Sequence, residues 1–61
     1  MRHFWITDEN ADNIMPDHRG QLRGAVAKAK TYLKKHPETE SIYINEGEDI
    51  VMSVQRWEVE A

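Results

Sequence analysis

Three histidines are the first residues to consider, because imidazole nitrogens bind transition metals and exchange protons near neutral pH. His3, His18 and His36 form no HxxxH pair, the spacing that would place two imidazoles on one face of a helix. His18 and His36 would stand at opposite ends of a single helix roughly 27 Å long. Zinc binding is therefore not expected, and we interpret His36 as a partner for the carboxyl end of that helix.

An acidic segment near the N-terminus is the second candidate site. Asp8, Asn10 and Asp12 occupy alternate positions and resemble the first half of a calcium-binding EF-hand loop. Two positions depart from that pattern: Asn13 replaces the glycine, and Arg19 stands where a bidentate glutamate should close the loop. Because Asp and Asn also build Asx turns, we favour a turn, and expect no metal and no cofactor.

Residue types for covalent catalysis are scarce. The chain has 61 residues and no cysteine, which excludes disulfides, thiolate metal sites and thiol nucleophiles. Ser41 and Ser53 lie in no nucleophile-elbow context, and no phosphate-binding glycine loop is present. A domain of this size also offers little cavity in which to desolvate a carboxylate. We therefore expect no enzymatic activity and no small-molecule substrate.

The cations are concentrated in one segment. Six of the eight Lys and Arg residues fall between positions 19 and 35, and residues 18–36 contain no acid. On a helix they form a basic ridge, in which four of them lie within about 60° of one another: Arg19, Arg23, Lys30 and Lys34. Such a ridge could contact phosphates, so nucleic-acid binding is the alternative function. A net charge of −3 favours a solvated helix face instead.

Apolar periodicity predicts the elements that carry these residues. Residues 2–7 alternate as a strand, with Phe4 and Ile6 on one face. From about residue 19 to 36 apolar residues recur every three or four positions, which predicts an amphipathic helix with Asp17 as its N-cap and Pro37 as its stop. Gly24 inside it indicates close packing or a tolerated defect. Residues 13–15 are a candidate short extra strand.

The last third of the chain predicts a β-hairpin. Residues 41–45 and 50–56 read as strands joined by a three-residue loop, Glu46 to Glu48, with Gly47 at positive φ. This register pairs Ile44 with Ile50 and Ile42 with Met52 on the helix side.

The order strand, helix, strand, strand predicts one α+β domain over residues 1–61: a two-layer sandwich with one helix on a three-stranded, mostly antiparallel sheet. The predicted core consists of these apolar residues: Phe4, Ile6, Leu22, Val26, Ala29, Leu33, Ile42, Ile44, Ile50, Met52 and Val54.

A single helix can cover only one side of this sheet, so the other side is the candidate binding surface. The anchors that we expect there are Trp5, Tyr43, Val51 and Trp57. Such aromatics could stack on unpaired bases, contact a protein partner or a second copy, or pack across strands beneath the 8–16 loop. We favour an interaction module that binds a protein partner or itself as a homodimer. The first residues turn acidic at Asp8 before a long apolar run forms, which indicates no signal peptide or membrane span and favours a cytoplasmic protein.

Overall fold

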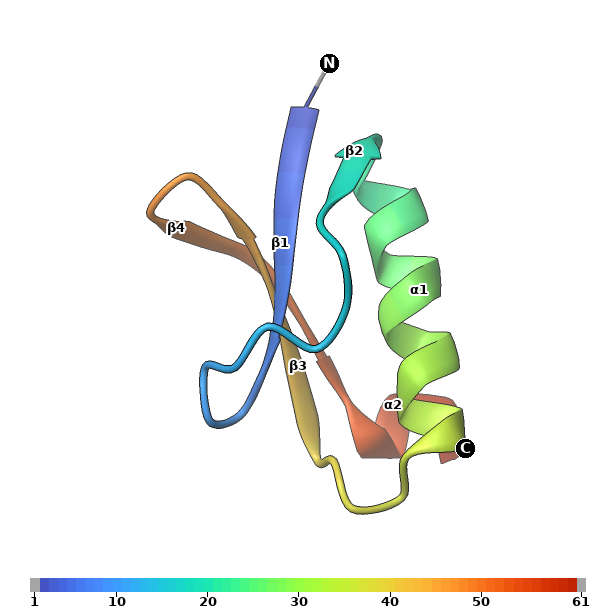
Figure 1. The fold of residues 1–61 in the computed structure, drawn as a ribbon. Helices are drawn as coiled ribbons and strands as arrows, with labels where there is room; N and C mark the ends of the chain where they lie inside the picture. Colours follow the sequence, from blue (N-terminus) through green and yellow to red (C-terminus); the bar gives the residue numbers. More distant parts are fainter. Residues whose placement is uncertain (1, 61) are drawn as a thin grey trace.

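A computed structural model describes residues 2–60 and shows one long helix on an antiparallel sheet of four strands (Figure 1). The elements are β1 (Arg2–Asp8), β2 (His18–Gly20), α1 (Leu22–Lys35), β3 (Ser41–Glu46), β4 (Asp49–Gln55) and α2 (Arg56–Glu60). Neighbouring strands follow the order β2-β1-β3-β4, and every pair is antiparallel. The predicted α+β sandwich is therefore confirmed, with a fourth strand in the sheet.

The extra strand lies at residues 18–20 and not at 13–15. Residues 2–4 of β1 pair with residues 18–20, whereas Asn13 makes only an isolated bridge to Thr7. The backbone N–H of Ile14 donates to the carbonyl oxygen of Ile6 at 3.2 Å. Pro16 follows closely and has no N–H to donate, which accounts for a contact that does not grow into a strand.

The helix begins at Leu22, later than the predicted residue 19. Its N-cap is Gln21, which makes no side-chain capping hydrogen bond. Asp17, the predicted N-cap, instead directs its carboxylate to the imidazole of His3. The first predicted turn is absent because its residues are used in β2, and Gly20 at φ +136° turns the chain from that strand toward α1. The helix ends at Lys35, with His36 as its C-cap directly before Pro37 and with Lys34 and Lys35 in its last turn.

Gly24 permits a close contact between α1 and β2. A β carbon at this position would lie 2.7 Å from Nε2 of His18. The half-buried His18 ring also stacks on the Phe4 ring, with 6.4 Å between their centroids. The glycine that costs helix stability is therefore explained by close packing, one of the two interpretations of the sequence.

The β3–β4 hairpin contains a bulge that the sequence did not indicate. Gly47 has the predicted positive φ, 66°. The register pairs Glu46 with Asp49 and Asn45 with Ile50, and then shifts so that Ile44 pairs with Met52. The predicted Ile44–Ile50 and Ile42–Met52 pairs are wrong, because the turn is one residue shorter and β4 holds one extra residue beyond it. Directly opposed residues share a face, so Ile50 lies on the side of Asn45, away from α1.

The buried core lies between α1 and one face of the sheet. Its members are at most 1% exposed: Phe4, Ile6, Ala25, Ala29, Leu33, Ile42, Ile44 and Val54. Leu22 and Val26 are half-buried against it. Two predicted core residues are exposed, Ile50 at 62% and Met52 at 39%. The bulge accounts for Ile50, and Met52 stays on the helix side but at the edge of the sheet.

A short C-terminal helix replaces the predicted end of the last strand. At its start the carboxylate of Glu58 accepts a hydrogen bond from the backbone N–H of Gln55 at 2.6 Å, as in a capping box. The Arg56 guanidinium donates to the carbonyl oxygen of Thr39 at 2.7 Å and also to that of His36. These bonds fasten α2 to the connection between α1 and β3. Within residues 2–60, neither helix has the length and apolar character that crossing a membrane requires.

Candidate interaction site

The side of the sheet turned away from α1, which we call the open face, collects the candidate binding residues. Alternation along the strands and the observed register assign to it His3, Trp5, Thr7, Arg19, Ser41, Tyr43, Asn45, Ile50, Ser53 and Gln55. The residues from β1, β3 and β4 include no Asp, Glu, Lys or Arg, and the one charged residue that the register adds is Arg19 on the edge strand β2, opposite His3. The open face therefore combines two aromatic rings and an aliphatic side chain with neutral polar groups.

Trp5 lies on β1 with 38% of its surface exposed. Its ring stacks on the imidazole of His3, with 4.4 Å between centroids and 23° between planes. His3 is held in turn by Asp17. The Trp5 side chain is thus oriented by a stacked ring whose own position is fixed, and a pre-oriented aromatic loses little entropy on binding.

Tyr43 and Asn45 are residues of β3 that lie on the open face. Tyr43 is half-buried between Thr7 of β1 and Ser53 of β4. The Asn45 amide nitrogen donates to the carbonyl oxygen of Trp5 at 3.3 Å and to the Thr7 hydroxyl at 3.2 Å. These bonds fix the polar centre of the open face.

β4 adds apolar surface to this face. Val51, 36% exposed, is the extra residue at the bulge. Ile50 is more exposed than either Val51 or Met52, its apolar neighbours on β4. Ile50 stands directly opposite Asn45, which in turn pairs with Trp5. Ile50 was predicted to be core, since a bulge leaves no reliable mark in a single sequence. The structure thus gives the open face an anchor that the sequence had assigned to the other side.

Trp57 does not join this group. It lies in α2, a helix that contacts α1 and the end of β4, and 70% of its surface is exposed. The sequence placed it at the end of a strand. Of the four predicted anchors, Trp5, Tyr43 and Val51 therefore share the sheet, and Trp57 lies beyond it.

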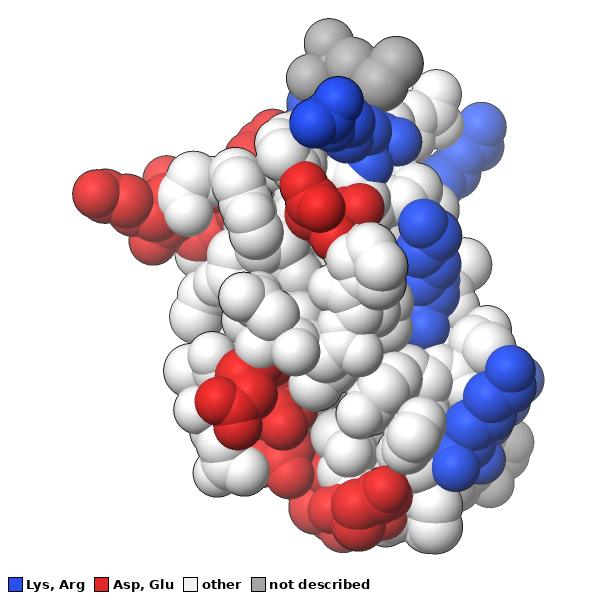
Figure 2. Space-filling model, viewed as in Figure 1, with Lys and Arg blue, Asp and Glu red and all other residues white. Residues whose placement is uncertain are grey.

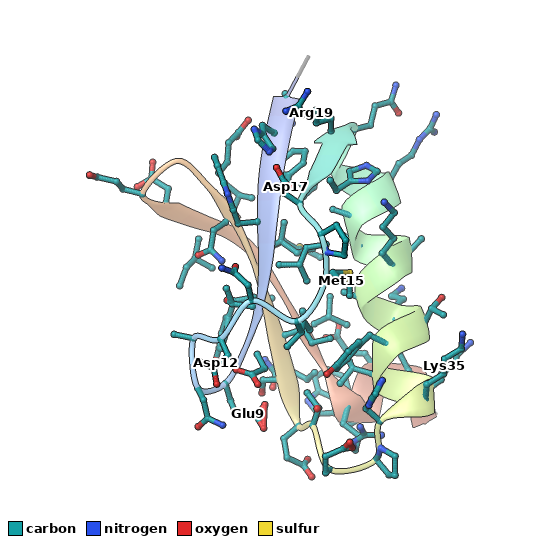
Figure 3. All side chains as sticks on the ribbon, in the orientation of Figure 1. Glu9, Asp12, Met15, Asp17, Arg19 and Lys35 are labelled. Carbon is teal, nitrogen blue, oxygen red and sulfur yellow. The ribbon has the colours of Figure 1, made fainter. Side chains whose placement is uncertain are left out.

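The loop of residues 9–17 runs beside β1 and packs at the helix side. Ile14 and Met15 contact the core, and Met15 points toward α1 (Figure 3). The carboxylate of Asp8 accepts hydrogen bonds from the backbone N–H groups of Asn10 and Asp12, at 2.9 and 3.1 Å. This is the Asx-turn geometry that the sequence favoured over an EF-hand loop. Among residues 2–60, no three His, Asp or Glu side chains are grouped to hold a metal ion.

The basic ridge is shorter than predicted. Arg23, Lys30 and Lys34 are exposed on α1, but Arg19 lies on β2, opposite His3 (Figure 3). It leaves the helix because residues 18–20 pair with β1. The remaining cations run along the side of the molecule formed by α1, and the acidic groups gather at the β3–β4 turn and around the 9–12 loop (Figure 2). In the structure the basic ridge consists of Arg23, Lys30 and Lys34.

One exposed ion pair joins β1 to β3. The Arg2 guanidinium donates two hydrogen bonds to the Glu46 carboxylate, at 2.9 and 2.8 Å, and lies over the Phe4 ring. These bonds lower the pKa of Glu46 and raise the pKa of Arg2. The pair closes the end of the sheet near the hairpin turn.

Two grooves flank α1. One, of about 460 Å³, lies between the helix and β4 and is lined by Leu22, Arg23, Val26, Ala27, Lys30 and Met52. The other, of about 360 Å³, lies on the side of the 9–17 loop, where Met15 and Lys35 help to line it.

Comparisons of the chain with models of protein families, with curated proteins and with solved structures find no match. The candidate sites therefore rest on the geometry described above.

Proposed function

We propose that the protein is a non-catalytic interaction module whose open face binds a second copy of the chain. The observation that carries this proposal is the composition of that face: Trp5, Tyr43 and Ile50 are surrounded by neutral polar side chains of β1, β3 and β4, and the one strand cation, Arg19, lies on the edge strand β2. Exposed aromatic residues are typical anchors of protein interfaces.

A second copy suits this face because of its charge. The protein carries a net charge of −3, so two copies repel each other overall. When the open face meets itself across a two-fold axis, its β1, β3 and β4 residues bring no formal charges together, and Arg19 lies at the β2 edge of the sheet. Packing of one sheet on another would bury the half-exposed Trp5 ring and the exposed Ile50 side chain.

The two tryptophans provide a matched test, because both are exposed but only Trp5 lies on the open face. We expect sedimentation equilibrium from micromolar to millimolar concentration to show a dimer for the natural chain. Trp5→Ser should remain monomeric throughout, and Trp57→Ser should dimerise like the natural chain. Circular dichroism would verify that both variants keep the fold.

Two results would refute this proposal. One is a natural chain that stays monomeric at millimolar concentration. The other is a dimer that Trp57→Ser dissociates and Trp5→Ser leaves intact.

A further inference from the structure

The outer edge of β4 is open to a further strand. β4 ends the order β2-β1-β3-β4, so no strand among residues 2–60 pairs with its outer side. Its seven residues include neither Lys, Arg nor Pro, with which edge strands commonly discourage such pairing. Beyond the bulge, residues 52–55 keep a regular register with β3. This stretch can accept a strand through backbone hydrogen bonds.

The groove between α1 and β4 lies beside that edge on the helix side. Leu22, Val26 and Met52 give it an apolar lining, and the exposed cations Arg23 and Lys30 stand along it. Met52 belongs to both features, since it sits in β4 and lines the groove. Alternate side chains of a strand added to β4 would face α1. Those side chains would enter the groove.

We propose that this edge and groove bind an extended acidic segment of another protein. The backbone of the segment pairs with residues 52–55. The alternate side chains that face α1 include both apolar groups, which contact Leu22 and Val26, and carboxylates, which face Arg23 and Lys30. Charge complementarity selects the partner, because α1 holds five cations and no acid over its 14 residues. The site is separate from the open face and does not depend on self-association there.

A second copy is less suited to this edge than to the open face. Two identical β4 edges that pair antiparallel are related by a two-fold axis perpendicular to the sheet, which leaves both α1 helices on the same side. The two basic ridges would then face each other across the joined sheet. Like charges brought together at an interface oppose association. An acidic strand instead neutralises these cations.

Titration of the ¹⁵N-labelled chain with the blocked peptide ITETVTE, in which Ile, Val and two Glu occupy alternate positions on one face, tests the proposal. We expect resonance shifts and slower amide exchange at residues 52–55, and weaker binding at high salt. The double variant Arg23→Glu/Lys30→Glu should bind about tenfold more weakly, since it reverses two exposed ion-pairing groups. Lys35→Glu is the matched control: it reverses a cation of α1 outside this groove and should change the affinity by less than about twofold.

Modified peptides test strand pairing without altering the protein. N-methylation of those peptide amides that face β4 should abolish binding, and N-methylation of the alternate amides should be tolerated, because only one set pairs with the edge. Trp5→Ser should keep its affinity for the peptide, which separates this site from the open face.

The proposal is overturned if ITETVTE fails to bind, if the basic peptide ITKTVTK binds equally well, or if both N-methylated peptides bind alike. Resonance shifts confined to the open face would also overturn it. If oligo-dT shifts the groove resonances and the peptide does not, the ridge serves nucleic acid instead.

Discussion

The two faces of the sheet differ sharply although the same alternation along the strands produces both. On β1 and β3 the helix-side residues Phe4, Ile6 and Ile44 are fully buried, whereas Trp5, their neighbour on the open face, is 38% exposed. Strand geometry determines which residues share a face, and the position of α1 determines which face is shielded from water. A chain with a single long helix therefore keeps one face available for association.

β4 follows this alternation over only part of its length. Val54 is 1% exposed on the helix side, as the alternation requires. Before the bulge, Ile50 stands on the open face and Val51 is more than a third exposed. One extra residue in a strand reverses the face of every residue beyond it. The difference between the two faces is therefore well defined on β1 and β3 and shifts within β4.

Two valines of β4 test the comparison with the same chemical change. We expect Val54→Ala to lower the free energy of unfolding by about 2 to 3 kcal/mol, through lost burial of two methyl groups and the cavity that they leave. Val51→Ala should cost about 0.5 kcal/mol, as expected for a side chain in partial contact with water. Urea denaturation of both variants, at a concentration where the protein is monomeric, measures the difference.

Losses below about 1 kcal/mol for both valine variants would contradict the assignment of Val54 to the covered face. Equal losses above 2 kcal/mol would instead indicate that the open face is covered within the single chain.

Gly24 tests how closely the covered side is packed. An alanine β carbon would lie 2.7 Å from Nε2 of His18. We expect Gly24→Ala to destabilise the protein by about 1 kcal/mol, because overpacking outweighs the gain in helix propensity. In a His18→Ala background the same change should stabilise it by about 1 kcal/mol. Denaturation of the four proteins of this double-mutant cycle gives the coupling energy.

An equal effect of Gly24→Ala in both backgrounds would mean that the His18 ring does not press on the helix. The glycine would then be a tolerated defect, which was the other interpretation of the sequence.

The sequence predicts the layers of this fold better than its boundaries. The helical period of Ala29 and Leu33 and the strand alternation of Phe4 and Ile6 correctly predicted the core, because apolar periodicity reports burial directly. The prediction that the helix begins at residue 19 was wrong. Arg19 is compatible with a helix as well as with a strand, and only the pairing with β1 decides between them.

Candidate site residues were predictable to a similar extent. Trp5 and Tyr43 follow from alternation alone, and the structure places both on the open face. Trp57 was misplaced because Gln55 is not one of the Ser, Thr, Asp or Asn residues that mark a helix start, although its N–H bonds to Glu58 as in a capping box. Ile50 depends on the bulge, a tertiary choice that no local pattern in the sequence specified.

Acid titration tests the ion pair at the end of the sheet. Hydrogen bonds from Arg2 hold the pKa of Glu46 below its ordinary value of 4.5 in the folded protein. The unfolded chain therefore takes up this proton at a higher pH than the folded chain does. The stabilisation is complete above about 4.5 and is lost as the pH falls through the lower, folded value.

Glu46→Gln should flatten this acid-side decline in stability, and Arg2→Gln should flatten it to the same extent. Because Arg2 also lies over Phe4, its loss should lower stability at every pH in addition. Thermal unfolding between pH 3 and 7 measures both effects. An unchanged slope in Glu46→Gln would show that the pair contributes nothing to pH-dependent stability.

Ile50 gives the smallest expected change and the sharpest test of the bulge. On the open face its replacement by threonine, another β-branched residue, should alter the stability of the monomer by no more than about 0.5 kcal/mol. If the hairpin had a three-residue loop instead, Ile50 would lie opposite Ile44 beneath α1. Threonine would then bury a hydroxyl there and cost about 2 kcal/mol or more. Nuclear Overhauser contacts give an independent test. A cross-strand contact of Ile50 with Asn45 supports the bulge. A contact with Ile44 in its place would assign Ile50 to the core and remove it from the open face.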